Sequence, residues 1–174
     1  MWQPVLMING YLISVLGLAM LIPAAVDMLE TGRNWSLFVT SSIVSLFIGL
    51  SLFLGNRTKI EKITLQQGYL LTAVSWVSLT LLATLPFILS DVTPGFADAL
   101  FEAMSGLSTT GATVITDLEV LPDSILLWRS MLNGLGGVGI VIFAVALLPF
   151  LGIGGMQIFQ RENSDLNDKF MPKF

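Results

Sequence analysis

Four long apolar stretches constrain this chain more than any other feature of its 174 residues. They cover about residues 5–26, 35–54, 69–89 and 125–151. Each supplies about 20 residues or more, which at 1.5 Å rise per helical residue covers the roughly 30 Å hydrocarbon core of a bilayer. A backbone in lipid must satisfy its own hydrogen bonds, and a helix does so within one segment. The sequence therefore predicts an all-α membrane protein with four transmembrane helices.

Composition agrees with a membrane location and excludes several classes of function. Charged residues make up 11% of the chain, against roughly 25% in soluble domains. Cysteine and histidine are absent, which removes disulfides, thiolate metal sites and histidine acid–base chemistry. The net charge of −4 leaves no polybasic surface, and the spans show no polar cluster typical of a membrane enzyme. We expect membrane lipid as a partner, with no nucleic acid, no cofactor and no enzymatic activity.

The first apolar stretch has two interpretations, a membrane span or a signal peptide. Residues 1–4 carry no basic residue, and the apolar run that follows is longer than the core of a typical signal peptide. These two features favour a membrane span.

Charged residues between the stretches predict the orientation in the membrane. Residues 55–67 contain Arg57, Lys59 and Lys62, and three more basic residues follow the fourth stretch. The region between the third and fourth stretches is mainly acidic. Because basic residues favour the cytoplasmic side, we expect both termini in the cytoplasm and residues 90–124 outside.

Residues 96–107 are predicted to form a helix that is too short to cross the membrane. Pro94 and Gly95 precede it and Gly106 lies near its end, which match helix start and stop signals. About 12 residues give a length of roughly 18 Å, well short of the bilayer core. Helical spacing places four apolar residues on one face: Ala97, Leu100, Phe101 and Met104. Asp98 and Glu102 fall on another face.

An extended polar segment, residues 108–114, follows this short helix and has Gly111 at its centre. A half-helix and an extended strand between two spans are typical of a re-entrant pore loop, because irregular backbone survives at membrane depth only where protein or water covers it. Carbonyl oxygens of such a strand can replace the water shell of a cation, and the helix directs its partly negative end at the ion path. The alternative is an amphipathic surface helix with an exposed Ser/Thr loop. Local pattern alone leaves both open.

A family resemblance favours the pore loop. The run Phe101–Val114, with the letters FEAMSGLSTTGATV, resembles the pore helix and filter signature of the TrkH/KtrB/HKT superfamily of potassium transporters. Residues 128–130 and 136–140 resemble the start of the helix that follows the filter in that family. The similarity continues over 148–149 and 154–157 and covers nearly the whole chain.

The resemblance implies a division into three parts. Residues 1–58 would form the extra N-terminal transmembrane hairpin of the TrkH branch, 59–159 the first membrane–pore–membrane repeat, and 160–174 a polar cytoplasmic tail. It also implies potassium uptake across a bacterial inner membrane, with a cytosolic nucleotide-binding regulatory subunit of the TrkA/KtrA kind as a partner.

The resemblance further implies the ion-binding residues. Backbone carbonyls of Thr109, Thr110, Gly111 and Ala112 would form the ion-binding set, with K⁺, the transported ion, held at the first three.

The number of repeats differs from the family pattern. Family members carry four such repeats around one pore, and this sequence has one, so it resembles the first third of a TrkH-type protein. We therefore expect the remaining pore repeats, or a homo-oligomer, as partners. The alternative function is a non-conducting fragment, or a scaffold or regulatory membrane subunit.

Three other features each have a structural and a functional interpretation. Residues 134–139 match the dinucleotide fingerprint GxGxxG but lack the preceding strand that the motif needs, so close helix packing or a bendable helix is preferred. Arg129 either extends to the membrane interface or pairs with an acidic residue such as Glu102 or Asp117. Five acidic residues either raise the local cation concentration or form a solvated face: Asp98, Glu102, Asp117, Glu119 and Asp123.

Overall fold

The computed structural model describes residues 2–30, 32–58, 64–116 and 118–147, and within these ranges the regular structure is entirely helical. The helices in chain order are α1 (Gln3–Ala19), α2 (Leu21–Glu30), α3 (Trp35–Gly55), α4 (Leu65–Ala83), α5 (Leu85–Leu89), α6 (Phe96–Leu107), the 3₁₀ turn η1 (Leu118–Val120) and α7 (Asp123–Leu147). The chain divides into two compact units, residues 1–139 and 140–174. The first unit contains α1 to α6, η1 and most of α7. The predicted boundaries between hairpin, repeat and tail stay predictions.

Among the described residues, four helical segments are long and apolar enough to cross a membrane, as the sequence predicted. They are Gln3–Glu30, Trp35–Gly55, Leu65–Leu89 and Asp123–Val141. The chain is therefore a multi-pass membrane protein with an all-helical fold. The expectations for Lys59, Lys62 and residues 148–174, including the tail, lie outside the described residues.

Two of the four spans are broken by a proline. The first consists of α1 and α2, which meet at Met20 before Pro23, and the third consists of α4 and α5, which meet at Thr84 before Pro86. A proline lacks the N–H that would continue the helical hydrogen bonds, and its ring crowds the preceding turn. The Thr80 carbonyl beside the second break accepts both the Thr84 hydroxyl, at 2.7 Å, and the Thr84 N–H, at 3.1 Å.

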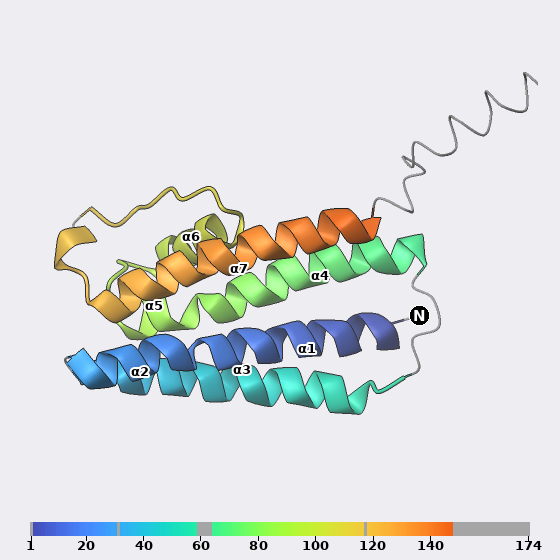
Figure 1. The fold of residues 1–174 in the computed structure, drawn as a ribbon, viewed down its shortest axis with the longest axis horizontal. Helices are drawn as coiled ribbons and strands as arrows, with labels where there is room; N and C mark the ends of the chain where they lie inside the picture. Colours follow the sequence, from blue (N-terminus) through green and yellow to red (C-terminus); the bar gives the residue numbers. More distant parts are fainter. Residues whose placement is uncertain (1, 31, 59–63, 117, 148–174) are drawn as a thin grey trace, which may run out of the picture. The chain divides into compact units, whose positions relative to one another are not determined.

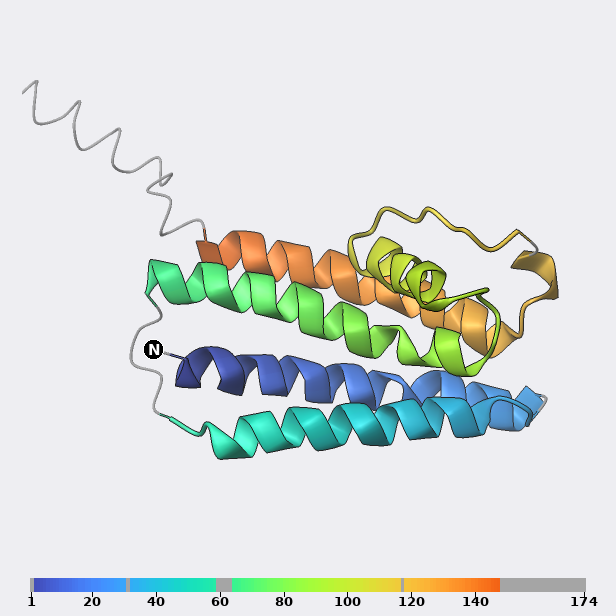
Figure 2. The ribbon, with the colours of Figure 1, turned by 180° about the vertical axis from the view of Figure 1, so that it is seen from behind.

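The N-terminal hairpin is held by close contact between small residues. Helices α1 and α3 run antiparallel and side by side (Figures 1 and 2). A Cβ added to Gly10 would lie 2.6 Å from the Gly49 carbonyl oxygen, so the two backbones touch there. The Ser42 hydroxyl donates across the pair to the Gly17 carbonyl at 2.7 Å. Small and hydroxyl residues are typical of helix pairs that pack in lipid.

Polar and aromatic contacts join the hairpin to the helices that follow it. The Ser78 hydroxyl of α4 donates to the Asn9 side chain of α1 at 2.9 Å. The rings of Phe38 in α3 and Trp128 in α7 meet edge to face, with centroids 6.4 Å apart. The Trp128 indole N–H donates to the Ala83 carbonyl at 3.1 Å, so this buried nitrogen has a hydrogen-bond partner inside the core. These contacts join α7 to α3 of the hairpin and to the end of α4.

Asp27, which follows the predicted apolar stretch 5–26, lies inside helix α2. It is 2% exposed, and its carboxylate accepts the backbone N–H groups of Asn34 and Trp35 at 2.7 and 2.9 Å. It also accepts the Ser124 hydroxyl of α7 at 3.1 Å. The acidic side chain is tolerated because it caps the start of α3, where N–H groups lack helical partners. The first span consequently extends to Glu30.

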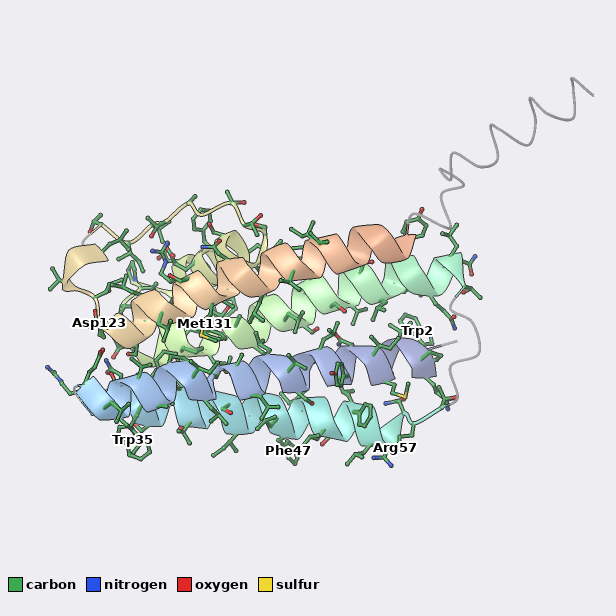
Figure 3. All side chains as sticks on the ribbon, viewed as in Figure 1. Trp2, Trp35, Phe47, Arg57, Asp123 and Met131 are labelled. Carbon is green, nitrogen blue, oxygen red and sulfur yellow. The ribbon has the colours of Figure 1, made fainter. Side chains whose placement is uncertain are left out.

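The outer surface of the bundle is apolar along its middle and polar or aromatic at its ends. Figure 3 shows Trp2 and Arg57 at one end of the bundle and Trp35 and Asp123 at the other. Phe47 projects from the middle of α3 and is 73% exposed. Tryptophans near both ends and bare apolar side chains between them match a surface that faces lipid.

Candidate ion-binding site

The short helix α6 begins and ends where the sequence predicted, at Phe96 and Leu107. It contacts α4 and α5 and lies at the end of the bundle where α2 and α5 are found (Figures 1 and 2). Its last turn rests on α7, because a Cβ added to Gly136 would lie 1.9 Å from the Leu107 carbonyl oxygen. Gly106 in turn faces the Leu132 side chain. Two glycines therefore let α6 and α7 approach to backbone contact.

The buried face of α6 is the one that carries Glu102, and the face with the large apolar residues is exposed. Ala99, Glu102 and Ala103 are buried, whereas Phe101 and Met104 are 44% and 42% exposed. Small residues are needed on the inner face because α6 lies so close to its neighbours. The sequence pattern identified both faces, but amphipathicity did not indicate which one packs inside the chain.

The polar segment after α6 turns back over the end of the helix. Thr109 donates its N–H to the Gly106 carbonyl at 2.9 Å. Thr110 and Gly111 both donate to the Ser105 carbonyl, at 3.0 and 3.3 Å. The segment thus satisfies carbonyl groups that a helix end leaves without partners.

Two residues of this segment have left-handed backbone conformations. The φ angles are +58° at Thr109 and +73° at Gly111. Glycine adopts this region freely, but a β-branched threonine does so rarely and at a cost of roughly 1–2 kcal/mol. Strained residues of this kind persist where the surroundings hold them, and they cluster at functional sites. The strained backbone at Thr109 is therefore typical of a functional segment.

The same hydrogen bonds fix the direction of the carbonyl groups. In a trans peptide the carbonyl points opposite to the N–H of the next residue. Since the N–H groups of residues 109–111 point at α6, the carbonyls of residues 108–110 point away from it. The Ala112 carbonyl is directed back and accepts the Ser105 hydroxyl at 2.6 Å.

Three of the four carbonyls that were predicted to bind the ion accept no hydrogen bond from the described residues. Within the described residues, the carbonyls of residues 109–111 accept no hydrogen bond, and the segment 109–114 is exposed. Across the same residues, no cluster of three or more acidic side chains is placed to hold a metal ion. A cation at this segment would therefore meet backbone oxygens, with the Ala112 carbonyl already engaged by one donor.

The polar segment runs back along α6 and is held by a buried carboxylate. Glu102 is 1% exposed. Its Oε1 accepts the Thr113 hydroxyl at 2.5 Å and the Val114 N–H at 2.7 Å. Its Oε2 accepts the Arg129 Nε–H of α7 at 2.8 Å in a salt bridge. Of the two interpretations of Arg129, pairing with Glu102 is confirmed.

The expectation that Glu102 belongs to an acidic mouth or a solvated face is wrong. Its carboxylate is buried and accepts three hydrogen bonds. The segment runs back along α6, which places Thr113 and Val114 beside the carboxylate, and Arg129 reaches it from α7. Asp117 lies outside the described residues. The roles of Ser105 and Glu102 in holding the segment were missed, and their i, i+3 spacing, which places both on one side of α6, was the available signal.

The glycine-rich stretch of α7 is helical and serves close packing at one position. Of its four glycines, only Gly136 meets another backbone, that of Leu107, whereas added Cβ atoms at Gly134 and Gly139 would meet nothing within 4 Å in the described part of the chain. The helix packing preferred from the sequence over a nucleotide site is confirmed at Gly136.

Comparisons with known proteins agree on one family. The family model described as "TrkH: Cation transport protein" matches residues 35–173. The Trk system potassium uptake protein TrkH of Halomonas elongata is 39% identical over 91% of this chain and 33% of its own length. The protein of the same name from Escherichia coli K12 is also 39% identical, over 89% of this chain and 32% of its own.

A solved structure shows the same fold. The crystal structure of the potassium transporter TrkH from Vibrio parahaemolyticus matches with a TM-score of 0.83 and 38% identity, over 89% of this chain and 33% of that chain. The chain thus spans about a third of the length of the relatives it matches.

Proposed function

The chain belongs to the TrkH family of cation transport proteins, and from this premise we propose that it contributes one wall of a potassium-selective pore. The observation that carries the proposal is the strained, exposed segment after α6, whose carbonyls at residues 109–111 are free. Relatives that bear the name of potassium uptake proteins supply the identity of the ion. The role is transport and not catalysis.

In this proposal α6 and residues 108–114 form a re-entrant pore loop. Carbonyls of Thr109, Thr110 and Gly111 replace part of the water shell of K⁺, with Ala112 completing the segment. The C-terminal end of α6 contributes its partly negative charge. One segment supplies oxygens from one side only, so further pore repeats or other copies of the chain supply the rest.

We also propose an orientation of the protein in the membrane and a regulatory partner. The protein lies in the bacterial inner membrane with the end near Arg57 in the cytoplasm and the loop before α7 outside, following the basic residues. A cytosolic nucleotide-binding regulatory subunit of the TrkA/KtrA kind is the proposed partner at the inner side.

The test is the ion preference of a Gly111→Ser variant in a complete four-repeat protein. A residue with a Cβ is strained at φ +73°, by roughly 1–2 kcal/mol, so we expect the carbonyls beside it to shift and the preference for K⁺ over Na⁺ to fall. Gly55→Ala is the matched control, because its added Cβ meets nothing within 4 Å among the described residues and its backbone is an ordinary helix end. Growth of a potassium-uptake-deficient host at low K⁺ reports uptake, and tracer flux reports selectivity. An unchanged preference in Gly111→Ser would remove Gly111 from the filter.

A further inference from the structure

The polar segment is held at both of its ends by α6. At its start, three N–H groups of residues 109–111 bind the Ser105 and Gly106 carbonyls. At its far end, the Glu102 carboxylate binds Thr113 and Val114. The space beside the Gly111 Cα is open, since an added Cβ would meet nothing within 4 Å among the described residues. The positions of the free carbonyls are therefore set by the two anchors.

We propose that Glu102 is a positioning residue for the filter segment, and that it sets ion selectivity through Thr113 and Val114 while Arg129 holds it in place. This inference rests on the proposed function of the segment. Selectivity among cations of similar charge depends on how many carbonyls reach the ion and where they are held. A carboxylate that fixes one end of the segment controls that placement without touching the ion.

Glu102 is not itself a ligand for the ion. Its side chain is 0% exposed, and its two oxygens already accept three hydrogen bonds, two at Oε1 and one at Oε2. A buried carboxylate is stable only when paired and hydrogen-bonded, and these three donors meet that condition. Hydrogen bonds to a charged group are also stronger than those between neutral groups. The contact is therefore a firm anchor for the segment.

Arg129 extends this anchor to a second helix. The face of α7 that meets α6 carries Arg129, Leu132 and Gly136 at the helical spacing i, i+3 and i+7. The Arg129 side chain is 18% exposed and reaches Glu102 from this face. The far end of the filter segment is thus fixed to α6 directly and to α7 through one ion pair.

The experiment measures the K⁺ over Na⁺ permeability ratio of a complete four-repeat protein in liposomes. In Glu102→Gln the shape is kept, but the charge is lost and an amide N–H₂ must share the pocket with the Arg129 donor. We expect the ratio to fall about tenfold, as charge-assisted hydrogen bonds to the segment are lost. The matched control is Asp98→Asn, which removes the same charge one helical turn earlier at a partly exposed position. It should leave the ratio within about twofold, because exposed charges are screened.

Thr113→Val gives a second test that leaves the ion pair intact. It removes the hydroxyl that donates to Glu102 and keeps the side-chain shape, so the ratio should fall even if Glu102→Gln does not fold. The double variant should be no worse than the more severe single one, because both break the same link. A role of Glu102 in folding alone would lower the amount of protein without moving the ratio.

The outcomes separate this inference from the proposed function. If the unaltered protein is selective but Thr113→Val keeps its ratio, the positioning role is overturned and the pore remains. If Glu102→Gln folds and matches Asp98→Asn, the positioning role is also overturned. If the unaltered protein shows no K⁺ preference, the proposed function fails, and this inference fails with it.

Discussion

Gly136→Ala should force the end of α6 away from α7. The added Cβ would lie 1.9 Å from the carbonyl oxygen of Leu107, 2.6 Å from its carbonyl carbon and 2.9 Å from its Cα. All three atoms belong to the backbone, so no side chain can rotate away. Favourable contacts between heavy atoms begin near 3.5 Å, which requires one helix to move by more than about 1 Å. The polar segment, residues 108–114, begins at the residue after Leu107 and must move with it.

The expected loss of stability follows from two opposing terms. Overpacking of a tight contact costs about 1–3 kcal/mol and sometimes more. Replacing glycine by alanine inside a helix returns up to about 1 kcal/mol. We expect a net destabilisation of about 1–2 kcal/mol for Gly136→Ala. Gly134→Ala is the matched control on the same helix, because its Cβ meets nothing within 4 Å among the described residues, and it should be neutral or stabilising by up to about 1 kcal/mol.

Thermal unfolding of the purified chain in detergent, followed by the retained monodisperse fraction, measures the difference. Gly136→Ala should melt below the unaltered chain, and Gly134→Ala at or above it. If the two alanine variants melt together, the backbone contact between α6 and α7 is not part of the folded protein.

Three further predictions use the same features. A cysteine at Arg57 should be protected from an impermeant thiol reagent in intact cells while one at Val120, which is 82% exposed, is labelled; the opposite pattern would invert the proposed orientation. Gly49→Ala should weaken the α1–α3 pair by about 1–3 kcal/mol, because its Cβ would lie 2.5–2.8 Å from α1 atoms, whereas Gly55→Ala, whose Cβ meets nothing within 4 Å in the described part of the chain, should not; equal melting in detergent would contradict this. The purified chain as a monomer should give no selective K⁺ flux into liposomes, since one segment supplies oxygens from one side only; selective flux from a species of monomer mass would refute the reasoning.

The elements that local chemistry determines were predictable from the sequence. Hydropathy located the four spans, and Pro94, Gly95 and Gly106 gave the bounds of the short helix to the residue. These signals act within a few residues of the place they mark, so they need no knowledge of the rest of the fold.

The partners of the buried acidic residues were harder to predict. Asp27 lies just beyond the predicted apolar stretch 5–26, yet it caps α3 and accepts Ser124, 97 positions away. For Arg129 the sequence offered a place at the membrane interface or an ion pair, and Glu102 was one of two candidates for that pair. Such pairs depend on which helices pack together, and charge patterning along one helix carries no such information.

The family resemblance located the candidate filter in the sequence, and the structure shows its backbone geometry. Periodicity could not separate a pore loop from a surface loop at residues 108–114. The positive φ at Thr109 and the direction of the carbonyls come from hydrogen bonds to the end of α6. No sequence rule predicts a left-handed threonine, because the strain is offset by contacts that only the folded chain provides.

A structure of the complete protein prepared with Tl⁺, a heavy ion of similar size to K⁺, tests the central claim most directly. Anomalous scattering would locate the ion without relying on transport. We predict a peak at the carbonyl oxygens of Thr109, Thr110 and Gly111, on the side of the segment that faces away from α6. A peak only at acidic side chains such as Asp98, or none beside residues 109–111, would contradict the assignment of this segment as a filter.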